Sequence, residues 1–88
     1  MKSLVTERFR RSFRELPEDI QRLAVKNYNL WRENPAHPSL HFRRLEGSAD
    51  LMTVRIGDHY RALGIQEPGI VTWVWIGTHA EYDRLTHR

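Results

Sequence analysis

The chain has 88 residues, no cysteine and a formal net charge of +3. This length suits one domain with a single core, and the lack of cysteine excludes disulfides, zinc ribbons and thiol catalysis. Arginine outnumbers lysine, and its planar guanidinium binds phosphate oxygens and stacks on bases. The charge therefore indicates either a nucleic-acid surface or an ordinary solvated one.

The sequence shows no sign of export or membrane insertion. The first residues, MKSLVTERFRRSF, contain no continuous apolar segment of the kind that a signal peptide needs. The longest apolar run, IVTWVWI, is far too short to span a bilayer. We therefore expect a cytoplasmic protein with no membrane partner.

The N-terminal part of the chain is predicted to be helical. Phe9, Phe13 and Leu16 share one helical face within residues 6–16, with Thr6 as a plausible N-cap. Pro17 ends this helix and starts another. The apolar stripe of the second helix consists of Ile20, Leu23, Ala24, Tyr28 and Trp31. Residues 33–35 end the pattern, and residues 2–5 are interpreted as an optional short edge strand.

The C-terminal half has the pattern of strands. Four runs, LHFRRLEG, LMTVRIGD, HYRALGIQ and IVTWVWIG, are separated by turn residues. In the last run Val71, Trp73 and Trp75 are predicted to share one face, and Ile70, Val74 and Ile76 the other. Apolar residues on both faces indicate an interior strand that is covered on both sides. Residues 78–88 are either a short helix or a tail. The predicted class is α+β, with two N-terminal helices packed on a four-stranded antiparallel sheet, or five strands with residues 2–5.

Two arginines in the strands are candidates for anion binding. Arg55 and Arg61 flank the tight turn at residues 57–58, so their side chains can converge on one face of a hairpin. Two adjacent guanidinium groups repel each other unless an anion lies between them, and phosphate suits that position. The alternative is that each arginine pairs with a carboxylate, which would be one of Glu46, Asp50, Asp58 and Glu67.

The segment after the last strand contains a histidine and a tyrosine, three residues apart. His79 can titrate near neutral pH and so can act as a general acid or base. If residues 78–88 begin a helical turn, His79 and Tyr82 lie on one side of it. The alternative is structural, with His79 capping the connection and Tyr82 packing its ring on Trp75.

The other polar and aromatic residues give weaker indications. The chain has five histidines, but Pro38 breaks any helix between His37 and His41, so we expect no metal site. No glycine-rich phosphate loop is present, and we expect no cofactor. Trp73 and Trp75 are interpreted as core residues, whereas Tyr60 is a candidate for stacking on a base.

Three segments resemble a known family. LHFRRLEG, VRIGDHYRALGI and WVWIGTHAEYDRL, in this order after two helices, are similar to motifs of the RelE/ParE superfamily of toxins from type II toxin–antitoxin systems. The resemblance covers nearly the whole chain, residues 1–88, as one toxin domain. It implies a twisted antiparallel sheet with both N-terminal helices on one face and an open face that would hold RNA.

The resemblance also implies an activity and a set of residues. RelE-like toxins cut mRNA in the ribosomal A site by attack of a ribose 2′-OH on the adjacent phosphorus. By position, Arg55 matches a basic residue of the third strand and Arg61 matches the phosphate-contacting arginine. His79 falls where members have a catalytic arginine or histidine, and Tyr82 lies near the C-terminal tyrosine. A lysine pair of some members is reduced here to Thr53 and Arg55.

Within that implied reaction each residue has an expected role. His79 would move a proton, Arg55 and Arg61 would stabilise the phosphorane, and Tyr82 would orient or stack on a base. Arg43, Arg44 and Tyr60 would contact RNA.

Two other functions are consistent with the same residues. A ParE-like member would inhibit DNA gyrase by binding it, and a decayed member would be an inert binding module. All of these alternatives predict a cognate antitoxin, whose amphipathic or extended segment would cover the apolar and basic surface.

Overall fold

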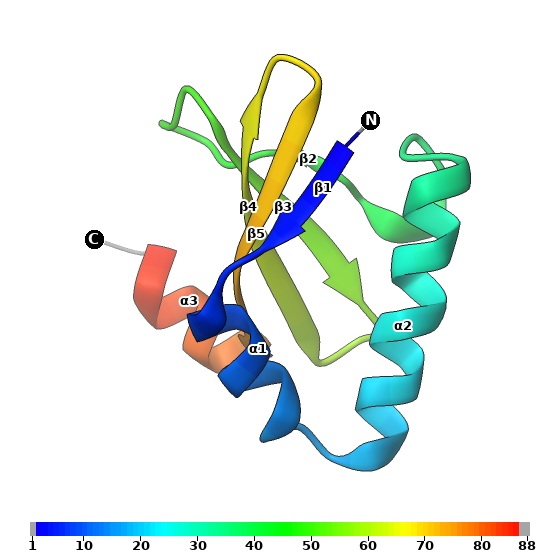
Figure 1. Cartoon of the computed structure of the whole chain (residues 1–88). Helices are drawn as coiled ribbons and strands as arrows, with labels where there is room; N and C mark the ends of the chain where they lie inside the picture. The colour runs from blue at the N-terminus through cyan, green and yellow to red at the C-terminus, as the bar shows by residue number, and fades with distance from the viewer. Residues whose placement is uncertain (1, 87–88) are drawn as a thin grey trace.

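The computed structural model describes residues 2–86. Within them the chain forms three α-helices, one short 3₁₀ helix and one five-stranded sheet (Figure 1). The N-terminal part comprises β1 (Lys2–Val5), α1 (Glu7–Arg14) and α2 (Glu18–Glu33). The 3₁₀ helix η1 (Pro38–Leu40) leads to β2 (Arg43–Arg44), β3 (Leu51–Ile56), β4 (Tyr60–Glu67), β5 (Ile70–Thr78) and α3 (His79–Thr86). Residues 87–88 of the predicted C-terminal segment lie outside the described residues.

The α+β class is confirmed, with corrections to the sheet. The strand order is β1-β5-β4-β3-β2, and β2 to β5 form the predicted antiparallel meander. The optional strand at residues 2–5 is present, but β1 pairs with β5 in parallel, so the sheet is mixed. The predicted strand in LHFRRLEG shrinks to β2, because η1 includes Leu40 and His41 adopts a left-handed conformation.

Helices α1 and α2 cover one face of the sheet. Thr6 caps α1 as predicted, since its Oγ1 accepts a hydrogen bond from Phe9 N at 3.1 Å, and α2 begins directly after Pro17. The core between these helices and the sheet contains an edge-to-face pair, Trp31 and Trp73, with ring centroids 5.3 Å apart. Trp31, Trp73 and Trp75 are all buried, which agrees with the interpretation of Trp73 and Trp75 as core residues.

A β-bulge between β4 and β5 changes which side chains share a face. Leu63 pairs with Trp75 and Gly64 pairs with Trp73, so Val74 has no partner across the ladder. The extra residue places Trp73 in the core under the helices and turns Trp75 to the opposite face. The prediction that both rings lie on one face was therefore wrong. Gly64 permits this packing, because a β-carbon there would lie 2.9 Å from the Trp73 ring and 2.9 Å from Val71 Cγ1.

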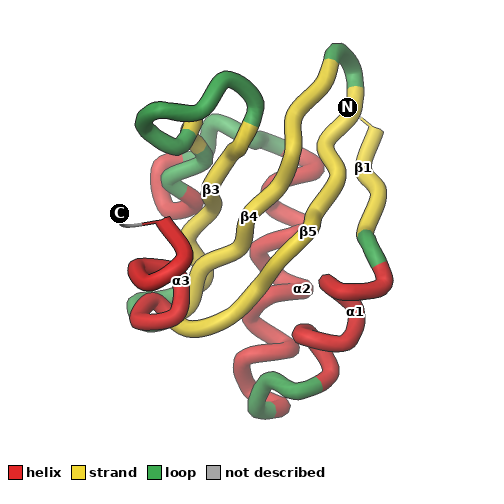
Figure 2. The backbone as a smooth tube through the Cα atoms, turned by 90° about the vertical axis from the view of Figure 1, so that its left-hand side faces the viewer, coloured by secondary structure: helices red, strands yellow, loops and turns green. Residues whose placement is uncertain are grey.

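The segment after β5 forms a helix rather than an irregular tail. Thr78 and Glu81 make a reciprocal cap at the start of α3: Glu81 N donates to Thr78 Oγ1 at 3.1 Å, and Thr78 N donates to Glu81 Oε1 at 3.1 Å. Figure 2 shows α3 in front of one end of the sheet, with α2 behind it. The face opposite α1 and α2 is otherwise open, and α3 borders it.

Candidate functional site

An arginine pair lies on the open face of the sheet. Arg55 of β3 and Arg61 of β4 are direct cross-strand partners, so their predicted convergence is confirmed. Arg55 Nη2 forms an ion pair with Asp58 Oδ1 at 2.5 Å, and its Nε donates to Gly57 O at 3.1 Å. For Arg55 the second prediction therefore holds: it pairs with a carboxylate, and its partner is Asp58.

Arg61 is bound differently. Its Nη1 donates to Tyr60 O at 2.7 Å and to Gly57 O at 3.3 Å. Among the described residues no carboxylate lies within ion-pair distance of its guanidinium. Partial burial and then the charge of Arg55 lower the pKa of Arg61 from its ordinary value. An anion bound beside Arg61 would relieve this unfavourable environment.

Helix α3 holds His79 and Tyr82 beside the arginine pair. His79 N donates to His59 O at 2.7 Å, which fixes the start of the helix against the residue that precedes β4. His79 Nδ1 lies 3.3 Å from Asp83 Oδ2. The rings of His79 and Tyr82 are 6.0 Å apart, tilted by 32°. Of the two predictions for this segment, the helix is correct. The side chains of His79 and Tyr82 line the same hollow.

These side chains line one polar hollow of about 300 Å³. Its walls are formed by His41, Arg43, Thr53, Arg55, Arg61, His79 and Tyr82. The hollow brings together all four predicted catalytic residues and one of the three predicted RNA contacts. His41 also lines the hollow, whereas the sequence indicated it only in the context of a metal site. Strand alternation does not reach His41, because β2 begins at Arg43 and the backbone of His41 is left-handed.

Two of the predicted RNA contacts lie elsewhere. Arg44 pairs with Met52 and is exposed at the edge of the sheet, outside the hollow. Tyr60 packs against the core on the face that α1 and α2 cover. It precedes Arg61 directly in β4, and successive strand residues point to opposite faces. These two positions do not favour contact with RNA bound in the hollow.

Two further features, a metal site and a membrane-spanning helix, were sought among the described residues. Within residues 2–86 no group of three or more histidine or carboxylate side chains is placed to hold a metal ion. In the same part of the chain, no helix combines the length and the hydrophobicity that crossing a membrane requires.

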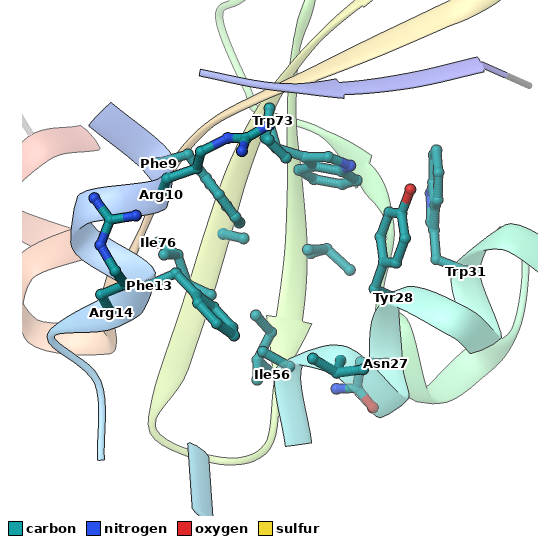
Figure 3. A pocket seen from close by; sticks show the side chains of 15 residues that line it. Phe9, Arg10, Phe13, Arg14, Asn27, Tyr28, Trp31, Ile56, Trp73 and Ile76 are labelled. Atoms are coloured by element: carbon teal, nitrogen blue, oxygen red, sulfur yellow. The ribbon is translucent and has the colours of Figure 1, made fainter. Parts of the chain in front are cut away.

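A second depression, the apolar groove, lies on the helix-covered face. Its volume is about 380 Å³, and it opens between α1 and α2 above the sheet. Figure 3 shows Phe9 and Phe13 of α1 opposite Tyr28 and Trp31 of α2, with Ile56, Trp73 and Ile76 from the strands. Arg10 and Arg14 stand on the α1 side. Phe9, Phe13 and Tyr28 are only partly buried along this groove, whereas Trp31, Trp73 and Ile76 beneath them are buried.

The fold and the hollow together define a class: a small α+β domain with a helical hairpin on one sheet face and an arginine-rich hollow on the other. The chain belongs to the ParE-like toxin domain family, whose model matches residues 18–84. This places it among the toxins of the RelE/ParE superfamily, as the sequence predicted. No curated protein matches the chain by sequence.

Solved toxin structures share the fold. A chain of the RelB–RelE antitoxin–toxin complex from Methanococcus jannaschii has a TM-score of 0.75 at 13% identity, covering 92% of this chain and 96% of that one. YafQ from Escherichia coli has a TM-score of 0.74 at 10% identity, with 92% and 96% covered. The isolated RelE toxin of E. coli gives 0.68 at 15% identity, with 96% and 94% covered. At these identities the similarity concerns the fold.

Proposed function

We propose that the protein is a toxin that cuts mRNA on the ribosome, by attack of a ribose 2′-OH on the adjacent phosphorus. The observation that carries this proposal is the convergence of Arg55, Arg61, His79 and Tyr82 in one hollow on the open face. A sheet face with paired guanidinium groups suits a phosphate chain, and the imidazole supplies a group that exchanges protons near neutral pH. Action on the ribosome would place the protein in the cytoplasm.

Each side chain has a role in this reaction. Arg61, which has no carboxylate partner among the described residues, would bind the non-bridging oxygens and stabilise the charge that develops on phosphorus. Arg55 would add a second cation by exchanging its contact with the exposed Asp58 for one with phosphate. His79 would transfer a proton, Tyr82 would orient or stack on a base, and Arg43 would hold the neighbouring phosphate.

The test is primer extension on a reporter mRNA translated in a reconstituted system, with and without the purified protein. We expect new cuts inside the translated region that disappear with His79→Ala. The variant should keep the far-ultraviolet circular dichroism and melting temperature of the wild type, because His79 is half-exposed. Cuts that persist unchanged with His79→Ala would contradict the role of the imidazole, and the absence of cuts by the wild type would contradict the nuclease proposal.

The family model favours a second candidate, since it describes a ParE-like toxin. In that case the protein would bind DNA gyrase and leave RNA intact. A supercoiling assay with purified gyrase separates the two candidates. Inhibition of supercoiling together with intact mRNA would assign the gyrase function, and the hollow would then have no catalytic role.

We further propose that a cognate antitoxin covers the apolar groove. Solved relatives include RelB–RelE complexes. The groove has an apolar lining and two arginines on one side, which suits an amphipathic helix whose polar edge is acidic. Val25 lines the groove and is 49% exposed. A bound helix would shield Val25 and the adjoining core side chains from water.

A further inference from the structure

The hollow contains a second histidine that the mechanism above does not use. His41 links η1 to β2 and has φ 47° and ψ 43°, the one positive φ of a non-glycine residue in the described part of the chain. Such a conformation is uncommon outside glycine, although histidine is among the residue types in which it is enriched. This turn ends the 3₁₀ helix and brings the His41 side chain to the wall of the hollow, beside Arg43.

The strand order places the arginine pair between His41 and His79. Arg43 pairs with Thr53 in antiparallel register. His41 lies two residues before the start of β2, and β2 is the strand next to β3, which carries Arg55. Arg55 pairs with Arg61, and Arg61 with Gly77, two residues before His79. Because β2 and β5 lie on opposite sides of the β3–β4 pair, His41 reaches the hollow from the segment before β2 and His79 from the end of β5, with the arginine pair between them.

The His41 ring is also free to react. His37, four residues earlier, uses Nδ1 to accept a hydrogen bond from Ser39 N at 3.2 Å. His79 uses Nδ1 in its contact with Asp83. Within residues 2–86 the His41 side chain is exposed and has no hydrogen-bond or ion-pair partner. Both of its ring nitrogens are thus available to a substrate.

We propose that His41 is the second proton-transfer residue of the hollow, acting with His79 across the arginine pair. This inference rests on the proposed ribonuclease function. The three arginines of the hollow stay protonated and cannot exchange protons, whereas an imidazole does so near neutral pH.

The reaction balances with two imidazoles. One of them accepts the proton of the 2′-OH as the bond from O2′ to phosphorus forms. The other, as imidazolium, donates its proton to O5′ as the bond from phosphorus to O5′ breaks. The products are a 2′,3′-cyclic phosphate and a free 5′-OH, and Arg55 and Arg61 hold the non-bridging oxygens throughout.

The first experiment measures single-turnover cleavage of a short mRNA in the ribosomal A site by the full chain. The variant is His41→Asn, because asparagine tolerates the left-handed conformation but cannot relay protons at neutral pH. The control is His59→Asn, an exposed histidine whose side chain lies outside the hollow. We expect His41→Asn to lower the saturated rate by roughly 10²–10⁴-fold, with unchanged half-saturating concentration and melting temperature. His41→Gly, which also permits positive φ, should give the same loss.

The second experiment repeats the assay with an mRNA whose 5′-bridging oxygen at the cut is replaced by sulfur. A thiolate leaves without protonation, so the variant that lacks the acid should regain much of its rate and the variant that lacks the base should not. Rescue of one variant, His41→Asn or His79→Asn, and not of the other supports the pair and assigns the roles. Rescue of both or of neither would overturn it.

The outcomes separate this inference from the function on which it rests. If the wild type cuts and His41→Asn cuts equally fast, only the role of His41 fails. If His41→Asn changes only the half-saturating concentration, His41 is a binding contact and the inference is wrong. If the wild type makes no cuts, the ribonuclease function itself fails.

Discussion

The role of Arg61 can be tested at the level of one side chain. Its guanidinium donates only to the backbone carbonyls of Tyr60 and Gly57, so removing it should leave the hairpin folded. We expect Arg61→Ala to lower mRNA cleavage by roughly 10²–10³-fold, the loss typical of one group that stabilises transition-state charge. Arg61→Lys should recover only part of the activity, because lysine lacks the planar fork. Single-turnover cleavage rates measure both effects.

The matched control for Arg61 is Arg22→Ala. Arg22 is exposed on α2, which covers the opposite face of the sheet, so cleavage by this variant should equal that of the wild type. Circular dichroism checks the fold of all three variants. Unfolding of Arg61→Ala would show that Arg61 supports the hairpin and that the anion site is misplaced.

At individual residues, success in prediction depended on regular strand geometry. Arg55 and Arg61 are equally distant from Asp58 in the sequence. A tight turn centred there makes them cross-strand partners, independently of the rest of the fold. Tyr60 lies outside the hollow although it adjoins Arg61, because strand alternation puts neighbours on opposite faces. His41 was missed for a different reason: its backbone is left-handed, and no periodic pattern reports the direction of such a side chain.

The α3 helix illustrates how one element positions half of the site. Thr78, His79, Ala80 and Glu81 spell the capping-box pattern Thr-x-x-Glu, and this signal would have resolved the choice between helix and tail. The same box orients α3 so that His79 and Tyr82 face the arginines. The cap stabilises the helix by about 1 kcal/mol, the typical value of an N-cap. For a helix of only eight residues this is enough to determine whether the helix forms.

The capping box should make α3 sensitive to acid. The backbone N–H of Thr78 and then its hydroxyl donate to Glu81, which lowers the pKa of this carboxyl group below its ordinary value. A lowered pKa means that the stabilisation is present above the pKa of an unfolded glutamate and is lost as pH falls through the lower folded value. We expect the amides of α3 to lose protection from hydrogen exchange in that acidic range, before the sheet unfolds.

Glu81→Ala tests the same element at neutral pH. It should reduce the protection of α3 several-fold, leave the amides of β3 and β4 protected, and abolish the acid-dependent change. Protection factors measured by nuclear magnetic resonance report each amide separately. If α3 in Glu81→Ala remains as protected as in the wild type, packing against the sheet rather than the cap determines its stability.

The sheet shows which element-level features the sequence does not specify. The antiparallel meander follows from four alternating runs with turn residues between them. The bulge at Leu63 and Gly64 does not, because it depends on how Trp73 packs against Trp31, which lies far away in the sequence, and over Gly64. The parallel pairing of β1 with β5 also joins segments far apart in sequence, because both helices and the other strands come between them.

For the molecule as a whole, the sheet separates two surfaces. One face contains the polar hollow, which is lined by three arginines, two histidines, Thr53 and Tyr82, and the other contains the apolar groove between α1 and α2. Antitoxin binding and RNA cleavage therefore use different side chains under the proposals above. Because the residues do not overlap, one activity should be alterable without the other.

Val25→Glu tests this separation. Val25 lines the groove and is 49% exposed, so glutamate there should fold but would bring a charge into the apolar contact. We expect antitoxin binding to weaken by about 10- to 100-fold, as a desolvated and unpaired charge would cause, while mRNA cleavage by the free toxin stays at the wild-type rate. Titration calorimetry with the cognate antitoxin and primer extension measure the two quantities.

The control for this prediction is Leu4→Glu. Leu4 is also 49% exposed, but it does not line the groove. It should therefore leave the affinity for the antitoxin close to that of the wild type. If both substitutions lower the affinity for the antitoxin equally, the antitoxin contacts the β1 edge as well as the groove. Loss of cleavage in Val25→Glu without loss of stability would mean that the two faces are coupled through the sheet, and the division of functions between them would be wrong.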